Sequence, residues 1–226
     1  MGLSHRPLRI VLVRHGESEA NLDKTIYERI PDHAVPLTPH GHEQAAETGK
    51  GLRELFENEP VRVYVSPYLR ARQTLDSLGL DDLISSQQEE PRLREQDWAN
   101  LQDTADIEQQ EQLRNAFGHF FYRFTHGESG ADVYDRVSTF LETIHRDFEV
   151  ADAPRNVLLV SHGLTMRLFC MRWFHWSVPF LESLRNPANA ETRVLLRQTD
   201  FRYKLDRPFE QWTPYEPTER ERSAWL

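Results

Sequence analysis

Three short apolar runs rich in β-branched residues constrain the fold of this chain more than any other feature. They cover residues 8–13, 61–65 and 156–160, and a fourth run at 193–196 is a candidate edge strand. Between them apolar side chains recur at helical spacing, most clearly in one broad stripe from residue 133 to residue 148. Strands that alternate with helices predict an α/β fold, a three-layer sandwich whose mostly parallel central sheet carries helices on both faces.

Length and composition fit a single domain over residues 1–226, with 38% hydrophobic and 28% charged residues. A glutamine-rich and then aromatic stretch at about 101–125 indicates a helical insertion, and the proline-rich stretch at about 207–226 indicates an irregular C-terminal tail. No apolar run is long enough to cross a bilayer, and the N-terminus does not resemble a secretory signal. The single Cys170 fits a reducing compartment, so we expect a soluble cytoplasmic protein with no integral membrane segment.

Arginine and histidine side chains follow the three buried runs. Arg14 and His15 come after the first run, Arg70 follows the second, and His162 follows the third. Because ligands of an open parallel sheet bind beyond the carboxyl ends of its strands, we expect these groups to meet at one edge. The net charge of −9 argues against nucleic acid as a partner, but a local cluster of cations can still hold a small anionic substrate.

The second of these junctions has the features of a helix start. Ser66 is a good N-cap and Pro67 a good first helical residue, which places Arg70 about one turn into a helix. Free N–H groups at a helix start and the forked guanidinium donors both suit a phosphate group. Gly16 and Gly163, each directly after a histidine, allow the backbone to turn sharply or to approach a ligand. Since neutral imidazole is a nucleophile near neutral pH, the pattern predicts phosphoryl chemistry.

The sequence from Val13 to Ser18, with Asn21 just after it, resembles the signature of the histidine phosphatase (phosphoglycerate-mutase-like) superfamily. Further stretches resemble that family's other motifs in the same order: Ser66 with Arg70, Ala71 and Thr74, then residues 92–95, then residues 161–163. Residues 121–136 are most similar to a plant and fungal phosphoglycerate-mutase-like branch. The resemblance therefore covers the chain from about residue 11 to residue 167.

This resemblance implies a histidine acid phosphatase-type enzyme, a phosphoric monoester hydrolase that acts on a small phosphorylated substrate without a metal or another cofactor. His15 would form the phosphohistidine. Glu95 would protonate the leaving oxygen and then take a proton from the attacking water. By the same resemblance, Arg14, Arg70 and His162 would also be catalytic and would hold the phosphoryl oxygens, with Asn21 assisting. The predicted substrate-binding residues are thus Arg14, Asn21, Arg70, His162 and Gly163.

Two positions near the predicted site keep alternatives open. Asp97 lies two residues from Glu95 and would share its face on an extended segment, so either carboxylate is a candidate acid. His126 precedes a second Gly-Glu-Ser run and is a rival nucleophile, but no strand and no arginine come directly before it. We expect instead that Gly127 ends one helix and that Ser129 or a neighbour caps the next. For Glu128 the resemblance leaves a pocket-lining role open.

Other chemistry-bearing residues have simpler interpretations. His40 and His42 lie near a helix start that Thr38 would cap, and without nearby carboxylate or cysteine ligands they do not predict a metal site. Thr38 is also a candidate for the pocket. We expect Arg167 and Arg172 to face solvent or to pair with acids.

The sequence leaves three functions open. A phosphatase ranks first. A phosphoglycerate mutase ranks second, because the segment from Trp98 to Asn100 departs from the tyrosine-glycine run of true mutases. A phosphate-binding regulatory protein with little turnover is the third. The motifs specify the phosphoryl end of the substrate and not its leaving group, and they do not indicate an oligomeric state.

Overall fold

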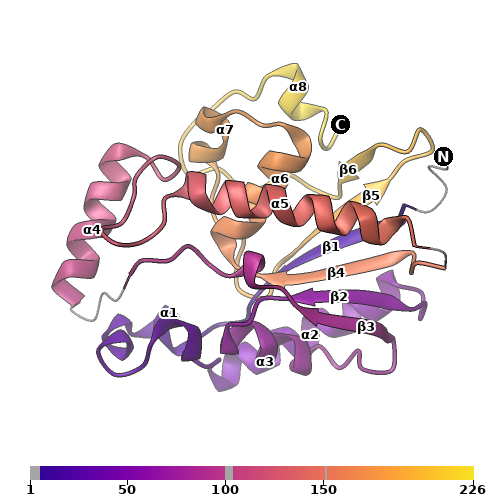
Figure 1. Ribbon diagram of the computed structural model, residues 1–226, viewed down its shortest axis with the longest axis horizontal. Helices are drawn as coiled ribbons and strands as arrows, with labels where there is room; N and C mark the ends of the chain where they lie inside the picture. Colours follow the sequence, from indigo (N-terminus) through magenta and orange to yellow (C-terminus); the bar gives the residue numbers. More distant parts are fainter. Residues whose placement is uncertain (1–5, 100–103, 151) are drawn as a thin grey trace.

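A six-stranded sheet forms the centre of the computed structural model, which describes residues 6–99, 104–150 and 152–226 (Figure 1). The strand order is β3-β2-β4-β1-β5-β6. The first four strands in this order are parallel, β5 runs antiparallel to β1, and β6 runs antiparallel to β5. The bounds are β1 Arg9–Arg14, β2 Val61–Val65, β3 Ile84–Glu89, β4 Asn156–Ser161, β5 Thr192–Arg197 and β6 Tyr203–Leu205. The predicted α/β class with a mostly parallel sheet is confirmed.

Helices cover both faces of this sheet (Figure 1). On one face lie α5 (Gly130–Phe148), α6 (Gly163–Phe174) and α7 (Val178–Ser183), and on the other lie α2 (Pro39–Leu55) and α3 (Leu69–Ser77). The period-2 alternation of β1 divides its side chains between two cores. Ile10 and Leu12 join the α5–α6 core, whereas Val11 and Val13 join the α2–α3 core. The central strands are therefore buried on both sides.

Shorter elements surround the carboxyl edge of the sheet. They are α1 (Glu19–Leu22), the 3-10 helices η2 (Lys24–Glu28), η3 (Asp32–Ala34) and η4 (Pro91–Leu93), and the longer α4 (Thr104–Phe117). Lys24 of η2 forms an ion pair with Glu111 of α4 at 2.5 Å, which joins two segments far apart in sequence. In Figure 1, α4 lies at the same end of the molecule as α1. Residues 101–103 of the expected insertion lie outside the described residues.

Two strands differ from the sequence expectations. β5 lies between β1 and β6, so the expectation of an edge strand at 193–196 was wrong. β3 was not predicted, because its sequence is dominated by Ser, Gln and Glu and its side chains are mostly exposed. Pairing with β2 on one side is sufficient to hold this polar edge strand.

The C-terminal stretch ends in the short helix α8 (Glu219–Arg222), which Thr218 caps. The Trp225 ring packs 5.8 Å from the Phe180 ring, and the Trp212 indole N–H donates to the Glu182 carbonyl at 2.6 Å. These contacts fasten the end of the chain to α7.

Candidate active site

The carboxyl ends of β1, β4 and β2 coincide. Arg14 is paired with Ser161, and Val65 is paired with Val160. The backbone N–H of His15 donates to the Ser161 carbonyl at 2.9 Å, and the His15 and His162 ring centroids are 5.2 Å apart. The strand register therefore brings the predicted histidines together, as the sequence indicated.

His15 is buried and is held in one tautomer. Its Nδ1 lies 2.7 Å from the Gly16 carbonyl oxygen. A carbonyl can only accept, so Nδ1 carries the proton and Nε2 keeps a free lone pair. Burial, with the positive charges of Arg70 and Arg14, lowers the pKa of His15 well below its usual range. The imidazole is therefore neutral and nucleophilic at neutral pH.

Gly16 is required by packing rather than by a ligand. A Cβ at this position would lie 2.4 Å from the Gly41 carbonyl oxygen of α2. The Gly16 N–H donates to the Thr74 hydroxyl at 2.9 Å, which anchors the loop on α3. The close approach of two backbones fixes the loop that carries His15.

His162 lies behind the surface of the site. Its side chain is fully buried, with Nε2 2.8 Å from the Ser66 hydroxyl and its ring 5.2 Å from the Tyr68 ring. Its Nδ1 is buried and has no hydrogen-bond partner among the described residues. Burial and the charge of Arg70 lower the pKa of His162. Gly163 begins α6, where a Cβ would lie 2.6 Å from the Asn186 side chain.

The two predicted arginines are held differently. Nη1 of Arg14 donates to the Pro187 carbonyl at 2.6 Å, while Nε is buried and has no partner among the described residues. Arg70 donates to both the backbone oxygen and a carboxylate oxygen of Asp32, at 2.7 Å and 2.9 Å. Burial is the largest single influence and acts to lower the pKa of Arg70, but Asp32, Tyr27 and Glu95 together outweigh it and raise that pKa. Both guanidinium groups remain cationic.

The predicted helix cap at Ser66 was wrong. α3 begins at Leu69 with Tyr68 as its N-cap, and Arg70 is the second helical residue. The Ser66 hydroxyl accepts from the Tyr68 N–H at 3.3 Å and contacts His162. The Ser66 hydroxyl contacts His162 instead of capping the helix, so the helix begins three residues later, at Leu69.

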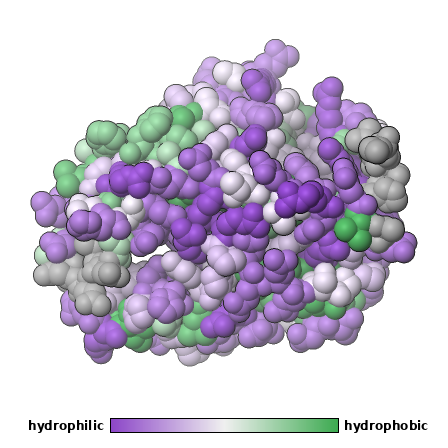
Figure 2. Space-filling model, viewed as in Figure 1, coloured by the Kyte–Doolittle hydropathy of each residue, from purple (hydrophilic) through white to green (hydrophobic). Residues whose placement is uncertain are grey.

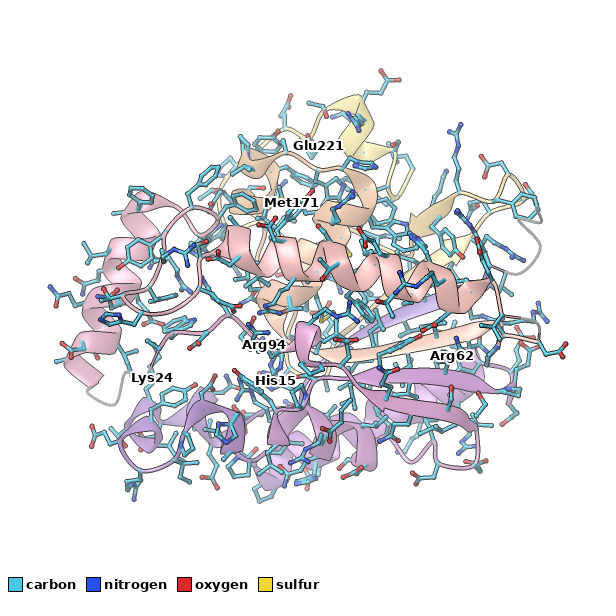
Figure 3. The ribbon with its side chains drawn as sticks, in the orientation of Figure 1. His15, Lys24, Arg62, Arg94, Met171 and Glu221 are labelled. Carbon is cyan, nitrogen blue, oxygen red and sulfur yellow. The ribbon has the colours of Figure 1, made fainter. Side chains whose placement is uncertain are left out.

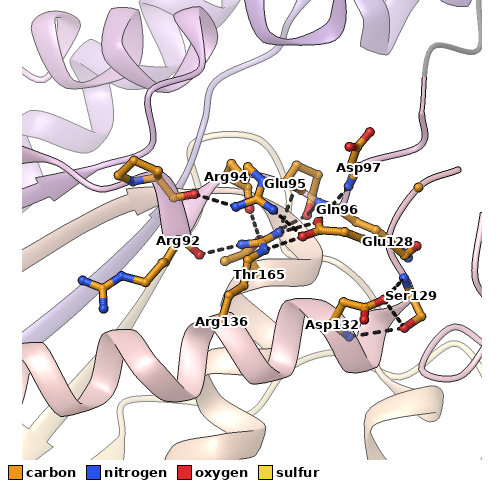
Figure 4. A network of polar contacts seen from close by, with 12 residues as sticks. Arg92, Arg94, Glu95, Gln96, Asp97, Glu128, Ser129, Asp132, Arg136 and Thr165 are labelled. Atoms are coloured by element: carbon orange, nitrogen blue, oxygen red, sulfur yellow. Dashed lines mark hydrogen bonds and ion pairs between the residues drawn. The ribbon is translucent and has the colours of Figure 1, made fainter.

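The segment that carries Glu95 is clamped on its backbone (Figure 4). Arg136 of α5 donates to the Arg92 carbonyl at 2.5 Å and to the Glu95 carbonyl at 3.1 Å. The Glu128 carboxylate binds Arg136 and accepts from the Asp97 N–H at 3.0 Å. Glu128 therefore supports the segment from behind and does not line the cavity that we describe.

Both candidate acids lie on the cavity wall. Glu95 is half-buried, and its Oε1 accepts from the Thr165 hydroxyl at 3.2 Å. Asp97 is exposed, and its Oδ1 accepts from the Ala99 N–H at 2.8 Å. The more enclosed position of Glu95 favours it as the group that faces the reacting centre.

A cavity of about 490 Å³ opens above these groups. Figure 2 shows a hollow at the surface between α4 and the α1 segment, and Figure 3 shows His15 at the carboxyl end of the sheet with Lys24 farther out. Sequence reasoning placed His15, Arg14, Arg70, Asn21 and Glu95 here, and all five line the cavity. It missed other lining residues, which include Tyr27, Asp32, Trp98, Arg114 and Arg167.

The expectation for Arg167 was wrong. Its side chain is only 3% exposed and lines the cavity, because α6 runs inward from the site between the sheet and α5. Arg172, one turn later, donates to the Ser138 hydroxyl of α5 at 3.1 Å. The spacing from His162 was the available signal, since Arg167 follows it on the first turns of the same helix.

The remaining sequence candidates lie outside the cavity. Ser129 caps α5 as expected, but Gly127 lies in a turn, and the exposed His126 has the left-handed φ of 64°. Thr38 caps α2, and its hydroxyl donates to the Glu17 carboxylate.

His42 contacts the Ser77 hydroxyl at 2.7 Å. Within the described ranges, no group of three or more His, Cys, Asp or Glu side chains is arranged to hold a metal ion.

No helix within the described residues combines the length and the apolar character that crossing a membrane would require.

Comparisons with known proteins agree with this geometry. The chain is 46% identical to phosphoglycerate mutase-like protein AT74 of Arabidopsis thaliana, over 84% of this chain and 65% of that protein, so it spans just under two thirds of that relative. It is 31% identical to broad-range acid phosphatase DET1 of Saccharomyces cerevisiae, over 93% of this chain and 92% of that protein.

Among solved structures, a mycobacterial glucosyl-3-phosphoglycerate phosphatase matches with a TM-score of 0.66 and 26% identity, over 89% of this chain and 98% of that one. The sequence profile of the histidine phosphatase superfamily (branch 1) matches residues 10–207. The chain therefore belongs to the histidine phosphatase superfamily.

Proposed function

We propose that this protein is a metal-independent phosphatase that hydrolyses phosphomonoesters through a phosphohistidine on His15. One observation carries the proposal. A buried, neutral imidazole whose Nδ1 is bonded to the Gly16 carbonyl lies on a cavity wall together with the cations Arg14 and Arg70. A free imidazole lone pair beside fixed positive charges is suited to attack on an anionic phosphorus centre.

The first step forms one bond and breaks another. Nε2 of His15 attacks phosphorus as the bond from phosphorus to the leaving oxygen breaks, and Glu95 donates a proton to that oxygen. Negative charge spreads over the equatorial phosphoryl oxygens, where Arg14 and Arg70 stabilise it. The proton on His15 Nδ1 stays bonded to the Gly16 carbonyl, which supports the positive charge of the phosphorylated ring.

The second step returns the enzyme to its starting state. The ionised Glu95 takes a proton from a water molecule, whose oxygen attacks phosphorus as the bond from phosphorus to nitrogen breaks. Inorganic phosphate leaves, and Glu95 is protonated again for the next turnover. Arg14 Nε and His162 Nδ1 are buried and have no hydrogen-bond partner among the described residues. A phosphoryl oxygen near His15 would supply that partner.

The relatives support hydrolysis as the reaction class. The yeast relative is named a broad-range acid phosphatase, and the mycobacterial structure is that of a phosphatase. On that basis we extend phosphatase activity to this chain, with a small phosphorylated molecule as substrate. The single Cys170 supports a cytoplasmic location.

Turnover and trapping test the proposal together. We expect hydrolysis of p-nitrophenyl phosphate that a chelator does not reduce, and a labelled phosphoryl group on His15 after alkaline quenching in denaturant. His15→Ala should lose both signals, and wild-type turnover in that variant would refute the mechanism.

Two further assays separate the alternatives. Phosphoryl transfer to phosphoglycerate that depends on a bisphosphate primer would identify a mutase. Phosphate binding without turnover across a broad phosphomonoester panel would identify a regulatory protein.

A further inference from the structure

Two arginines that the proposed mechanism does not use line the same cavity. Arg167 of α6 is only 3% exposed, and its Nη1 donates to the Leu184 carbonyl at 2.7 Å. Its Nε is buried and has no hydrogen-bond partner among the described residues. This guanidinium group has donors to spare, and no carboxylate among the described residues forms an ion pair with it.

Arg114 of α4 has the same character. Its guanidinium carbon lies 4.7 Å from the centre of the Trp98 ring and 5.7 Å from that of Phe124, so aromatic faces hold it in place. Its Nε is also buried without a partner in the described part of the chain. An arginine held over aromatic rings keeps N–H donors that the rings do not use and that a ligand oxygen can accept from.

Two of the carboxylates near these arginines, Glu111 and Glu182, have other partners, while Glu95 acts on Arg167 through its charge and makes no ion pair with it. Glu111 pairs with Lys24, and Glu182 accepts the backbone N–H groups of His119 and Phe120 at 2.9 Å and 2.7 Å. Within the described ranges, neither Arg114 nor Arg167 has a carboxylate oxygen within 4.0 Å. The two cations therefore face the cavity without direct neutralisation.

Burial makes this arrangement costly in the absence of an anion. Desolvation, together with the charges of Arg114 and Arg14, lowers the pKa of Arg167 to about 10, although the charges of Glu95 and Glu182 oppose that shift. An unpaired buried cation destabilises a fold unless a partner compensates it. Such uncompensated groups in a cavity mark a place where a ligand supplies the opposite charge.

We propose that Arg114 and Arg167 form a second anion-binding subsite, which holds a carboxylate or phosphate group on the leaving group of the substrate. The inference rests on the proposed phosphatase function, because it assigns the phosphoryl end to His15 and the second anion to these arginines. A cavity of about 490 Å³ accommodates a small metabolite with two charged ends. The preferred substrates are therefore phosphorylated acids or bisphosphates rather than phosphates of neutral alcohols.

Matched substrates test the subsite. A 3-hydroxypropyl phosphate serves as reference, its oxidised acid supplies a carboxylate, and the corresponding propane bisphosphate supplies a phosphate, with six-carbon analogues prepared in parallel. We expect at least one doubly anionic substrate to exceed its neutral reference in kcat/KM by about ten- to hundred-fold, as one to two charge-assisted contacts would give. Comparison of the acid with the bisphosphate shows whether the subsite accepts a carboxylate, a phosphate or both.

Variants assign the preference to the arginines. The preference is the kcat/KM for the doubly anionic substrate divided by the kcat/KM for its neutral reference. Arg114→Met and Arg167→Met should each lower this ratio by about ten-fold. Arg172→Met, on the same helix as Arg167 but bonded to Ser138 outside the cavity, should leave the ratio unchanged. If Arg167→Met does not fold, Arg114→Met on the more exposed α4 still decides the question. A ratio near one in the wild type, or a ratio that neither variant changes, overturns the inference.

Failure of the subsite differs from failure of the phosphatase proposal. An enzyme that hydrolyses p-nitrophenyl phosphate without any preference for a second charge retains the proposed function and lacks the subsite. If no phosphomonoester is hydrolysed, calorimetric titration of His15→Ala with the same matched pairs still measures the subsite. Tighter binding of the doubly charged ligand supports it, and equal binding refutes it.

Discussion

Glu128 binds the guanidinium group of Arg136 through both carboxylate oxygens, at 3.0 Å and 3.1 Å. The pair stands behind the segment of Glu95, because Arg136 also donates to the Glu95 carbonyl and Glu128 accepts from the Asp97 N–H. A fork-to-fork contact fixes both partners in one plane. Neither side chain needs to touch the substrate to set the position of Glu95, the proposed acid.

Glu128→Gln should lower kcat/KM by roughly ten- to hundred-fold, because displacement of a catalytic group by about 1 Å has that effect. The loss should depend on the leaving group. Alkyl phosphates need a proton on the leaving oxygen and should be affected strongly, whereas a dinitrophenyl phosphate needs none and should be affected little. Steady-state kinetics with both substrate types measure the difference.

Arg123→Ala provides the matched control. Arg123 is exposed, pairs with Asp132 at the α5 start and donates to the Gly127 carbonyl, and among the described residues it makes no hydrogen bond or ion pair with the Glu95 segment. We expect wild-type kinetics from it. An equal loss for both leaving groups in Glu128→Gln would indicate a general structural defect and contradict the positioning role.

Glu95→Gln and Asp97→Asn distinguish the two candidate acids. With Glu95 as the acid, Glu95→Gln should lower kcat/KM for alkyl phosphates by roughly 10²- to 10⁴-fold. Asp97→Asn should remain close to wild type, because Asp97 is exposed and its carboxylate accepts from the Ala99 N–H. The reverse pattern would transfer the role to Asp97.

Gly49→Ala should lower the free energy of unfolding by about 1–3 kcal/mol, as overpacking at a tight contact does. A Cβ at Gly49 would lie 1.9 Å from the Leu78 carbonyl oxygen, so α2 and α3 would have to separate. Gly51→Ala is the control on the same helix, where a Cβ meets nothing within 4 Å. It should raise stability by about 0.5–1 kcal/mol. Urea unfolding of both variants checks the opposite signs.

The sequence was sufficient to predict the sheet and the convergence of its strand ends. Buried parallel strands are continuous apolar runs, and their carboxyl ends meet in space, so His15, Arg70 and His162 could be placed near one another before any coordinates. The strand register confirms that placement. Local propensity did not locate the helix start at Leu69, because Ser66 is used by His162 instead of by the helix.

The outer part of the cavity was not predictable in the same way. Apart from its spacing from His162, Arg167 has no local signal that separates it from a solvent-facing arginine on a helix, and Arg114 and Asp32 come from segments with weak periodicity. The placement of Arg114 depends on how α4 and η2 pack across the carboxyl edge, as the contact between Lys24 and Glu111 illustrates. Such long-range contacts have no signature in a single sequence.

Three buried histidines predict that stability falls as the solution becomes acidic. Burial lowers the pKa of His119 to about 3, and burial also lowers the pKa of His15 and His162 well below the usual value. In the unfolded chain each imidazole takes up a proton near pH 6.5, while the folded chain does not. Below that pH the unfolded state therefore binds more protons than the folded state. These groups leave the free energy of unfolding unchanged above about pH 7.5, and they make it decline from about pH 6.5 downward.

Urea unfolding between pH 7.5 and pH 5 should show this decline. His119→Gln should reduce its slope by about one proton. A stability that is flat across this range would contradict the burial of neutral imidazoles at the site.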